Sequence, residues 1–251
     1  MKTNQLFRLI VFYLAAIILS NIFRFDLFHI QPYLESLPVW LMIFYGPLQA
    51  IGVLTGALVA LHWLSKERET DITLFGTSKK WSIAMGILPI LLLLVVGVNN
   101  NRGIESHYFG LVAGISTLIY CFFEEIGWRG YLEQELRDRS EFVRVLLIAL
   151  LWYLWHLKFL NNPDPLQNIQ LLGWLLLGSW GLGKIVHLTK SILAAACFHM
   201  GINIVMFNGF IREGLSSAGK AIILGTLFSI WILILVIWQK EKTAAGSKGN
   251  S

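Results

Sequence analysis

The chain has 251 residues, of which 56% are hydrophobic and only 14% are charged, and its formal net charge is +5. Its mean hydropathy is +0.64, whereas a soluble domain carries about 25% charged residues. This composition excludes an ordinary soluble enzyme and a disordered chain. It predicts an all-α polytopic membrane protein, because long apolar runs without alternation cross a bilayer only as helices.

Eight apolar segments come close to the length of about 20 residues that a membrane-spanning helix needs. In chain order they are 6–23, 38–64, 81–98, 109–136, 142–160, 166–183, 188–207 and 220–238. No small-residue cleavage site follows the first segment, so we expect an uncleaved span rather than a signal peptide. The sequence predicts a single transmembrane domain over 1–251, ending in a flexible cytoplasmic tail at 240–251.

The positive charges predict how the chain is oriented. With a cytoplasmic N-terminus, the inner segments hold 14 Lys and Arg residues and the outer segments hold five: Arg24, Arg102, Lys158, Arg212 and Lys220. Cytoplasmic loops are enriched in these residues, so we expect both termini in the cytoplasm. The basic residues lie between apolar runs and no nucleic-acid motif is present, so membrane lipid is expected as a partner and nucleic acid is not.

Ionisable residues inside spans are expensive and mark candidate functional sites. The fourth predicted span carries Glu124, Glu125 and Arg129. Glu125 and Arg129 are four residues apart and share a helix face, so we expect them to form an ion pair. Glu124 lies about 100° further round the helix. It is left to face another group, as a general base would.

Two histidines are placed to meet Glu124. If the charged turn after the fourth span centres near Ser140, Glu124 and His156 are both roughly 24 Å from that turn and level with each other. His199 lies roughly 16 Å into a span that starts on the same side. We therefore expect the three side chains to converge in the cytoplasmic half of the membrane, in a cavity that faces the cytosol.

Further polar residues share faces with these histidines. His199 and Asn203 lie one turn apart, and such a pair can stabilise an oxyanion. Trp152 lies one turn before His156, so its indole is expected to form a wall beside the imidazole and to contact the substrate. Two chemistries remain open. Glu124 can activate water, or Glu124, His156 and His199 can bind Zn²⁺ or another divalent metal with one open position.

Other intramembrane hydrolase designs do not fit this sequence. No His is followed by Glu, which excludes a helix carrying the H-E-x-x-H metalloprotease motif. All aspartates lie outside the predicted spans, which excludes an intramembrane aspartyl pair. Ser179 has Leu177 and Trp180 where a G-x-S-G serine site needs glycines. Cys121 and Cys197 lie in apolar runs, so no disulfide is expected.

Three patterns in chain order resemble the CAAX protease and bacteriocin-processing family, which includes the type II CAAX prenyl endopeptidases. They are Glu124-Glu125-x-x-x-Arg129, Trp152-x-x-x-His156 and His199-x-x-x-Asn203. The resemblance covers about 109–208. The second pattern usually begins with Phe in the family, and Trp152 is a conservative departure from it.

The resemblance implies an eight-helix intramembrane endopeptidase that acts on a membrane-associated protein or peptide. It implies that Glu124 activates water and that Glu125 and Arg129 arrange the Glu124 side chain. It also implies that His156 is a second polar partner in the site. His199 and Asn203 would hold the oxyanion. Since no acid partner for either imidazole is evident in the sequence, the metal-independent glutamate mechanism is favoured over the metal-dependent one, and both stay open.

The short loops favour a bacterial plasma-membrane protein, in which peptide processing or bacteriocin immunity is a plausible role. Two other classes of function remain alternatives. One is a transporter whose acids and histidines relay protons. The other is a non-catalytic scaffold that regulates a partner.

Overall fold

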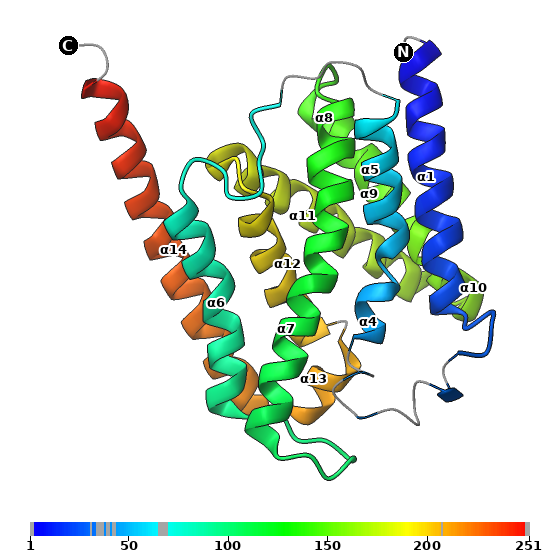
Figure 1. The fold of residues 1–251 in the computed structure, drawn as a ribbon, viewed down its shortest axis with the longest axis vertical. Helices are drawn as coiled ribbons and strands as arrows, with labels where there is room; N and C mark the ends of the chain where they lie inside the picture. Colours follow the sequence, from blue (N-terminus) through cyan, green and yellow to red (C-terminus); the bar gives the residue numbers. More distant parts are fainter. Residues whose placement is uncertain are drawn as a thin grey trace.

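The computed structural model describes residues 3–30, 32–33, 38, 41, 44–64, 70–206 and 208–248. Every named element among them is a helix (Figure 1). In chain order the helices are α1 (Thr3–Arg24), α4 (Tyr45–Leu48), α5 (Ile51–His62), α6 (Lys79–Val96), α7 (Ser106–Glu125), the π-helix η1 (Ile126–Leu132), α8 (Glu133–Glu135), α9 (Glu141–His156), α10 (Lys158–Asn161), α11 (Pro165–Thr189), α12 (Ile192–Met206), α13 (Gly209–Gly214) and α14 (Ser217–Lys248).

Five of these helical stretches are long and apolar enough to cross a membrane. They are Asn4–Arg24, Lys79–Val96, Ser106–Glu135, Pro165–Thr189 and Ser217–Ala244. The prediction of an all-α polytopic membrane protein is therefore confirmed.

The other three predicted spans correspond to shorter helices. α5 has 12 residues, α9 has 16 and α12 has 15. The predicted span 142–160 breaks at Leu157, whose φ of 51° is left-handed. Leucine rarely adopts this conformation, so the sequence gives no signal for the break. The predicted span 38–64 lies partly outside the described residues, and the total of eight crossings stays a prediction.

Polar side chains fix where several helices begin. Ser78 accepts a hydrogen bond from the Trp81 backbone N–H at the start of α6, and Glu105 accepts from two backbone N–H groups at the start of α7. Ser140 and Asp164 cap α9 and α11 in the same way. These bonds satisfy backbone donors that have no partner within the helix, so the loops hold the helix ends in register.

Both ends of the described chain lie at the same end of the bundle, at the top of Figure 1, which we call the terminal end. The loop between α6 and α7 lies at the opposite end, which we call the far end. α14 continues to Lys248, into the segment predicted as a flexible tail. Residues 249–251 of that predicted tail lie outside the described residues.

Small residues let α1 and α5 approach closely, and the two helices lie side by side in Figure 1. A Cβ atom on Gly52 would lie 2.6 Å from the backbone nitrogen of Ser20, and one on Gly56 would lie 2.6 Å from the carbonyl oxygen of Phe12. Glycines four residues apart are a familiar contact between membrane helices. Backbone contact between α1 and α5 therefore depends on both glycines.

The bundle contains two large apolar cores. One lies between α6, α7, α12 and α14 and includes Met85, Cys121, Met200, Leu227 and Trp231. The other lies between α1, α5, η1, α9 and α11 and includes Phe12, Val53, Trp128, Trp155 and Leu182. Tyr120 and Phe198 pack against both cores. A seam therefore runs between the cores along α7 and α12.

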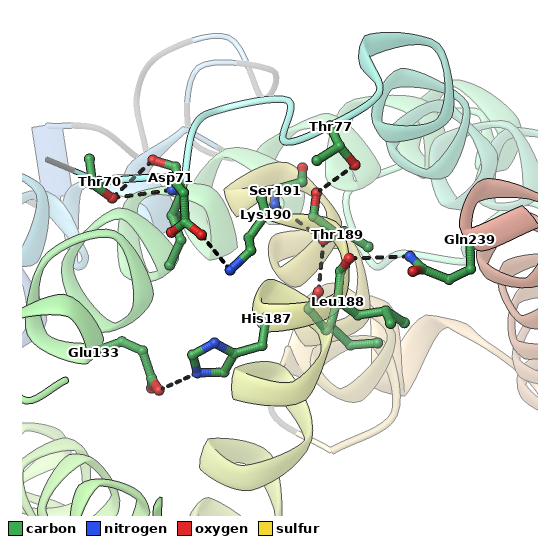
Figure 2. A network of polar contacts seen from close by, with 12 residues as sticks. Thr70, Asp71, Thr77, Glu133, His187, Leu188, Thr189, Lys190, Ser191 and Gln239 are labelled. Atoms are coloured by element: carbon green, nitrogen blue, oxygen red, sulfur yellow. Dashed lines mark hydrogen bonds and ion pairs between the residues drawn. The ribbon is translucent and has the colours of Figure 1, made fainter. Parts of the chain in front are cut away.

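A polar network closes the terminal end (Figure 2). Lys190 forms an ion pair with Asp71 at 2.5 Å, and His187 Nε2 lies 3.1 Å from an oxygen of the buried Glu133. The ammonium of Lys190 holds the pKa of Asp71 below its usual value. The Thr77 backbone N–H also donates to the Thr189 carbonyl. The segment before α6 is thereby tied to the turn between α11 and α12.

The orientation of the two ends can be measured with a cysteine at each end. Arg102 lies in the α6–α7 loop at the far end, and Lys184 lies on α11 near the terminal end; both are exposed. With cytoplasmic termini, Arg102→Cys should react with a membrane-impermeant maleimide in intact cells. Lys184→Cys should react only after permeabilisation. The native cysteines are buried and should stay unlabelled; the reverse pattern would place the termini outside.

Candidate active site

The candidate site begins where α7 changes into the π-helix η1. π-Helical turns are rare and are frequent at functional sites. Gly127 permits this turn to press against α5, because a Cβ atom there would overlap the Val53 side chain. The turn follows Glu124 and Glu125 in the chain, and it buries the side chains of Trp128 and Arg129 completely.

Glu125 is the centre of a buried charged network. Its side chain is fully buried, and it contacts the Arg129 guanidinium through both oxygens at 3.2 Å. His199 Nδ1 lies 2.9 Å from the Glu125 Oε1 atom. The Arg129 pairing confirms the contact expected from the four-residue spacing. A carboxylate accepts hydrogen bonds only, so the proton of this bond is on Nδ1 and His199 Nε2 is left for another partner.

The His199–Glu125 contact corrects one expectation from the sequence. The sequence favours a metal-independent mechanism because it shows no acid partner for either imidazole. In the structure, His199 has such a partner. Its partner lies 74 positions earlier in the chain. Only the packing of α12 against α7 brings the two side chains together.

The two oxygens of Glu124 have different surroundings. Oε2 accepts hydrogen bonds from the indole N–H groups of Trp152 at 2.7 Å and Trp128 at 3.2 Å. Oε1 is buried and has no hydrogen-bond partner among the described residues. The two indoles thus hold the carboxylate by one oxygen, and the Tyr120 side chain and Arg24 also interact with this carboxylate.

Trp152 connects the parts of the site. Besides its bond to Glu124, its ring lies edge-on to His199 with centroids 5.2 Å apart, and the Arg129 guanidinium carbon lies 4.6 Å from the ring centroid. The sequence predicts that Trp152 forms a wall beside His156, and those rings are 6.0 Å apart. Its hydrogen bond to Glu124 was not foreseen, because spacing along α9 says nothing about a partner on α7.

His156 is the last residue of α9. Its Nδ1 lies 2.8 Å from the Trp152 carbonyl oxygen, which can only accept, so Nδ1 carries the proton of this bond. Asn203 lies one turn after His199 and donates to the Cys121 sulfur at 3.1 Å. A thiol sulfur is a weak acceptor, so the Asn203 amide loses little free energy when it gives up this hydrogen bond for another acceptor.

A cavity of about 740 Å³ lies along the seam between the two cores. Glu124, Trp152, His156, His199 and Asn203 line one part of it. The structure therefore brings these predicted residues to a single cavity, while Glu125 and Arg129 lie behind it. The remaining wall is largely apolar and comes from α11, α12 and α14, including Leu177, Ile185, Phe198, Ile202, Leu224 and Phe228.

The cavity extends toward the far end of the bundle. Arg24 at the end of α1 and Lys158 at the start of α10 line it. Arg24 donates to the Trp155 carbonyl oxygen at 2.6 Å and stacks over the Trp155 ring. Both cations belong to segments that the charge count assigns to the outer face. The cytoplasmic termini and the cytosol-facing cavity both stay predictions.

Sequence reasoning did not assign a functional role to Arg24 or Lys158. Both were counted only as topology signals, although they are two of the few basic residues on the sparse outer side. Their position on the side with few basic residues was the feature of the sequence that could have indicated a functional role.

A metal site requires that its ligand side chains lie close together. Glu124, His156 and His199 would be the ligand set, but no three His, Cys, Asp or Glu side chains are close enough to hold one ion in the part of the chain that the structure describes. In this arrangement the three residues do not fit a metal site.

The comparisons with known proteins identify the region that holds the site. Residues 106–205 match the family model described as type II CAAX prenyl endopeptidase Rce1-like. Over these residues the chain is similar to the CAAX protease family. The matched region contains the seven predicted site residues, from Glu124 to Asn203.

One curated relative also matches. CAAX prenyl protease 2 of Methanococcus maripaludis is 29% identical over 141 residues, which cover 47% of this chain and 52% of that protein. The chain thus spans about half the length of this relative. No solved structure matches the chain.

The stability of the site should depend on Glu125 more than on Glu124. Glu125→Ala leaves the buried Arg129 without its carboxylate, and breaking a buried pair in this way costs about 3–5 kcal/mol. Glu124→Gln keeps an oxygen that can accept an indole N–H, so we expect a loss of at most about 1–2 kcal/mol. The free energies of unfolding can be compared in mixed-micelle SDS titrations. Equal losses for the two variants would contradict the network.

Proposed function

We propose that this chain is an intramembrane endopeptidase in which Glu124 activates the water that hydrolyses a peptide bond. The observation that carries the proposal is the asymmetry of the Glu124 carboxylate. Oε2 is fixed by two indole N–H groups, while Oε1 is buried without a partner in a residue that lines the cavity. A base needs one available oxygen in a fixed position, and this arrangement supplies it.

The chemistry follows from that oxygen. A water beside Oε1 gives a proton to Glu124 as its oxygen bonds to the carbonyl carbon of the substrate. The carbonyl oxygen becomes an oxyanion. When the intermediate collapses, the carbon–nitrogen bond breaks and the proton on Glu124 passes to the leaving amine, which regenerates the carboxylate.

We propose that His199 and Asn203 stabilise the oxyanion. Glu125 fixes the His199 ring through Nδ1, which leaves Nε2 as the atom that can donate when the imidazole is protonated. The Asn203 amide adds a second donor by leaving the Cys121 sulfur.

The other site residues act through positioning. Trp152 and Trp128 hold Glu124, and Arg129 holds Glu125. His156 keeps its proton on Nδ1, so the neutral ring has a lone pair on Nε2, which can orient the water or a substrate N–H. Because the donors for Zn²⁺ are not grouped, we propose the glutamate mechanism rather than the metal-dependent one.

The substrate we propose is a membrane-associated protein or peptide. The relative from Methanococcus maripaludis is named as a CAAX prenyl protease, and the apolar wall of the cavity suits a lipidated or hydrophobic segment. We propose a bacterial plasma membrane as the location, where peptide processing is a fitting role.

New protein termini provide the test of this function. Membranes from cells that express wild type should contain N-termini that are absent with Glu124→Gln at equal abundance, because the amide cannot take a proton from water. We expect a decrease of about 100-fold or more in these products, measured by quantitative mass spectrometry of N-termini.

The matched control is Glu241→Gln, an exposed acid at the terminal end of α14, which should give the wild-type set. Identical termini for Glu124→Gln and wild type would contradict the proposed base. No new termini with wild type would favour the proton-relay or scaffold readings.

A further inference from the structure

A pocket of about 690 Å³ lies at the terminal end of the bundle, within the polar network of Figure 2. Two acids, Asp71 and Glu133, line it together with two cations, Arg137 and Lys190. We call it the terminal pocket. It shares no lining residue with the active-site cavity, so it is a separate site.

Glu133 presents a buried acceptor to this pocket. Its side chain is only 3% exposed. Its Oε1 atom accepts a hydrogen bond from Arg144 Nε and lies 3.1 Å from His187 Nε2. Its Oε2 atom is buried and has no hydrogen-bond partner among the described residues. A buried carboxylate oxygen in this state favours a ligand that brings a donor, and a positively charged donor binds it most strongly.

The cations of the terminal pocket suit a phosphate. Arg137 lines the pocket from the exposed turn after α8, and guanidinium groups bind phosphate oxygens through paired N–H donors. Lys190 is held by Asp71 at 2.5 Å. With His187 neutral, the charges of the lining residues balance. A ligand with one positive and one negative group therefore matches the pocket better than an anion does, because an anion would face Asp71 and Glu133 without compensation.

A bare metal ion does not match the pocket. In the part of the chain that the structure describes, no three His, Cys, Asp or Glu side chains are close enough to hold one ion. An organic ammonium needs only a single buried acceptor, and Glu133 Oε2 supplies it.

The terminal pocket lies at the depth of lipid headgroups. The apolar stretch Ser106–Glu135 ends two residues after Glu133, and Pro165–Thr189 ends two residues after His187. Two residues of helix rise about 3 Å, whereas the headgroup layer on each side of the hydrocarbon core is about 5–7 Å thick. The ligand that this depth favours is a lipid of the surrounding membrane.

We infer that the terminal pocket binds a phospholipid whose headgroup carries a phosphate and a primary ammonium, as in phosphatidylethanolamine. The ammonium donates to Glu133 Oε2, and Arg137 binds the phosphate. Glu133 directly follows η1, so a bound headgroup stabilises the segment that leads into the active site. The inference stands apart from the proposed hydrolysis, because it involves no residue that lines the active-site cavity.

The number of N–H donors on the headgroup provides the test. The purified chain in detergent is titrated with lipids that have identical acyl chains and carry zero, one, two or three methyl groups on the headgroup nitrogen. The dissociation constant of the first bound lipid is measured by native mass spectrometry. We expect phosphatidylcholine, which has no N–H, to bind about 10-fold more weakly than phosphatidylethanolamine, as the loss of one charge-assisted hydrogen bond would give.

Two substitutions separate the two parts of the headgroup. Glu133→Gln should reduce the preference for phosphatidylethanolamine to less than about twofold, because the ammonium loses its charged acceptor. Arg137→Gln should weaken both lipids by a similar factor of about 10-fold and keep the preference, because both carry the same phosphate. Arg139→Gln is the matched control, since Arg139 is an exposed cation of the same turn that does not line the pocket. It should change neither affinity.

Three results would overturn the inference. They are equal affinity of wild type for the two lipids, a preference that survives Glu133→Gln, and tighter binding of phosphatidylglycerol than of phosphatidylethanolamine. The last result would make the pocket a site for anions. Glu133 also binds Arg144, so the thermal unfolding of each variant is measured first. If Glu133→Gln does not fold, the lipid series with wild type and with Arg137→Gln decides the question.

Discussion

The fold depends on how two adjacent acids are buried inside an apolar bundle. Glu125 is compensated by Arg129 and bonded to His199, while Glu124 is held by two indoles. An uncompensated charge in such surroundings would be too costly to keep. The need to satisfy these carboxylates therefore fixes α7, η1, α9 and α12 relative to one another, and the same contacts orient the groups that can act on a substrate.

The two apolar cores explain why the site remains accessible. Each core is packed by large residues on its own side, and the seam between them is left for the cavity. Close backbone contact of α1 with α5 stiffens one side, and the network around Lys190 ties down the terminal end. The site is thus built on rigid helices, and Arg24 and Lys158 line the part of the cavity nearest the far end.

The sequence predicted what depends on spacing along one helix. The Glu125–Arg129 pair, the helical character of the spans and the shared faces of His199 with Asn203 all follow from periodicity. Contacts between helices did not follow. The bond from Trp152 to Glu124 and the pairing of His199 with Glu125 require the packed bundle. The break at Leu157 was also missed, because a left-handed leucine is imposed by tertiary structure.

The most direct test of the central claim is the single-turnover cleavage rate of purified protein after treatment with a metal chelator, for wild type and for Glu124→Gln. The substrate is one identified from the new termini. If Glu124 activates water, the treated wild type should cleave at its untreated rate, and Glu124→Gln should be slower by about 100-fold or more. Loss of wild-type activity on chelation with recovery on adding Zn²⁺, or equal rates for the two proteins, would contradict the account.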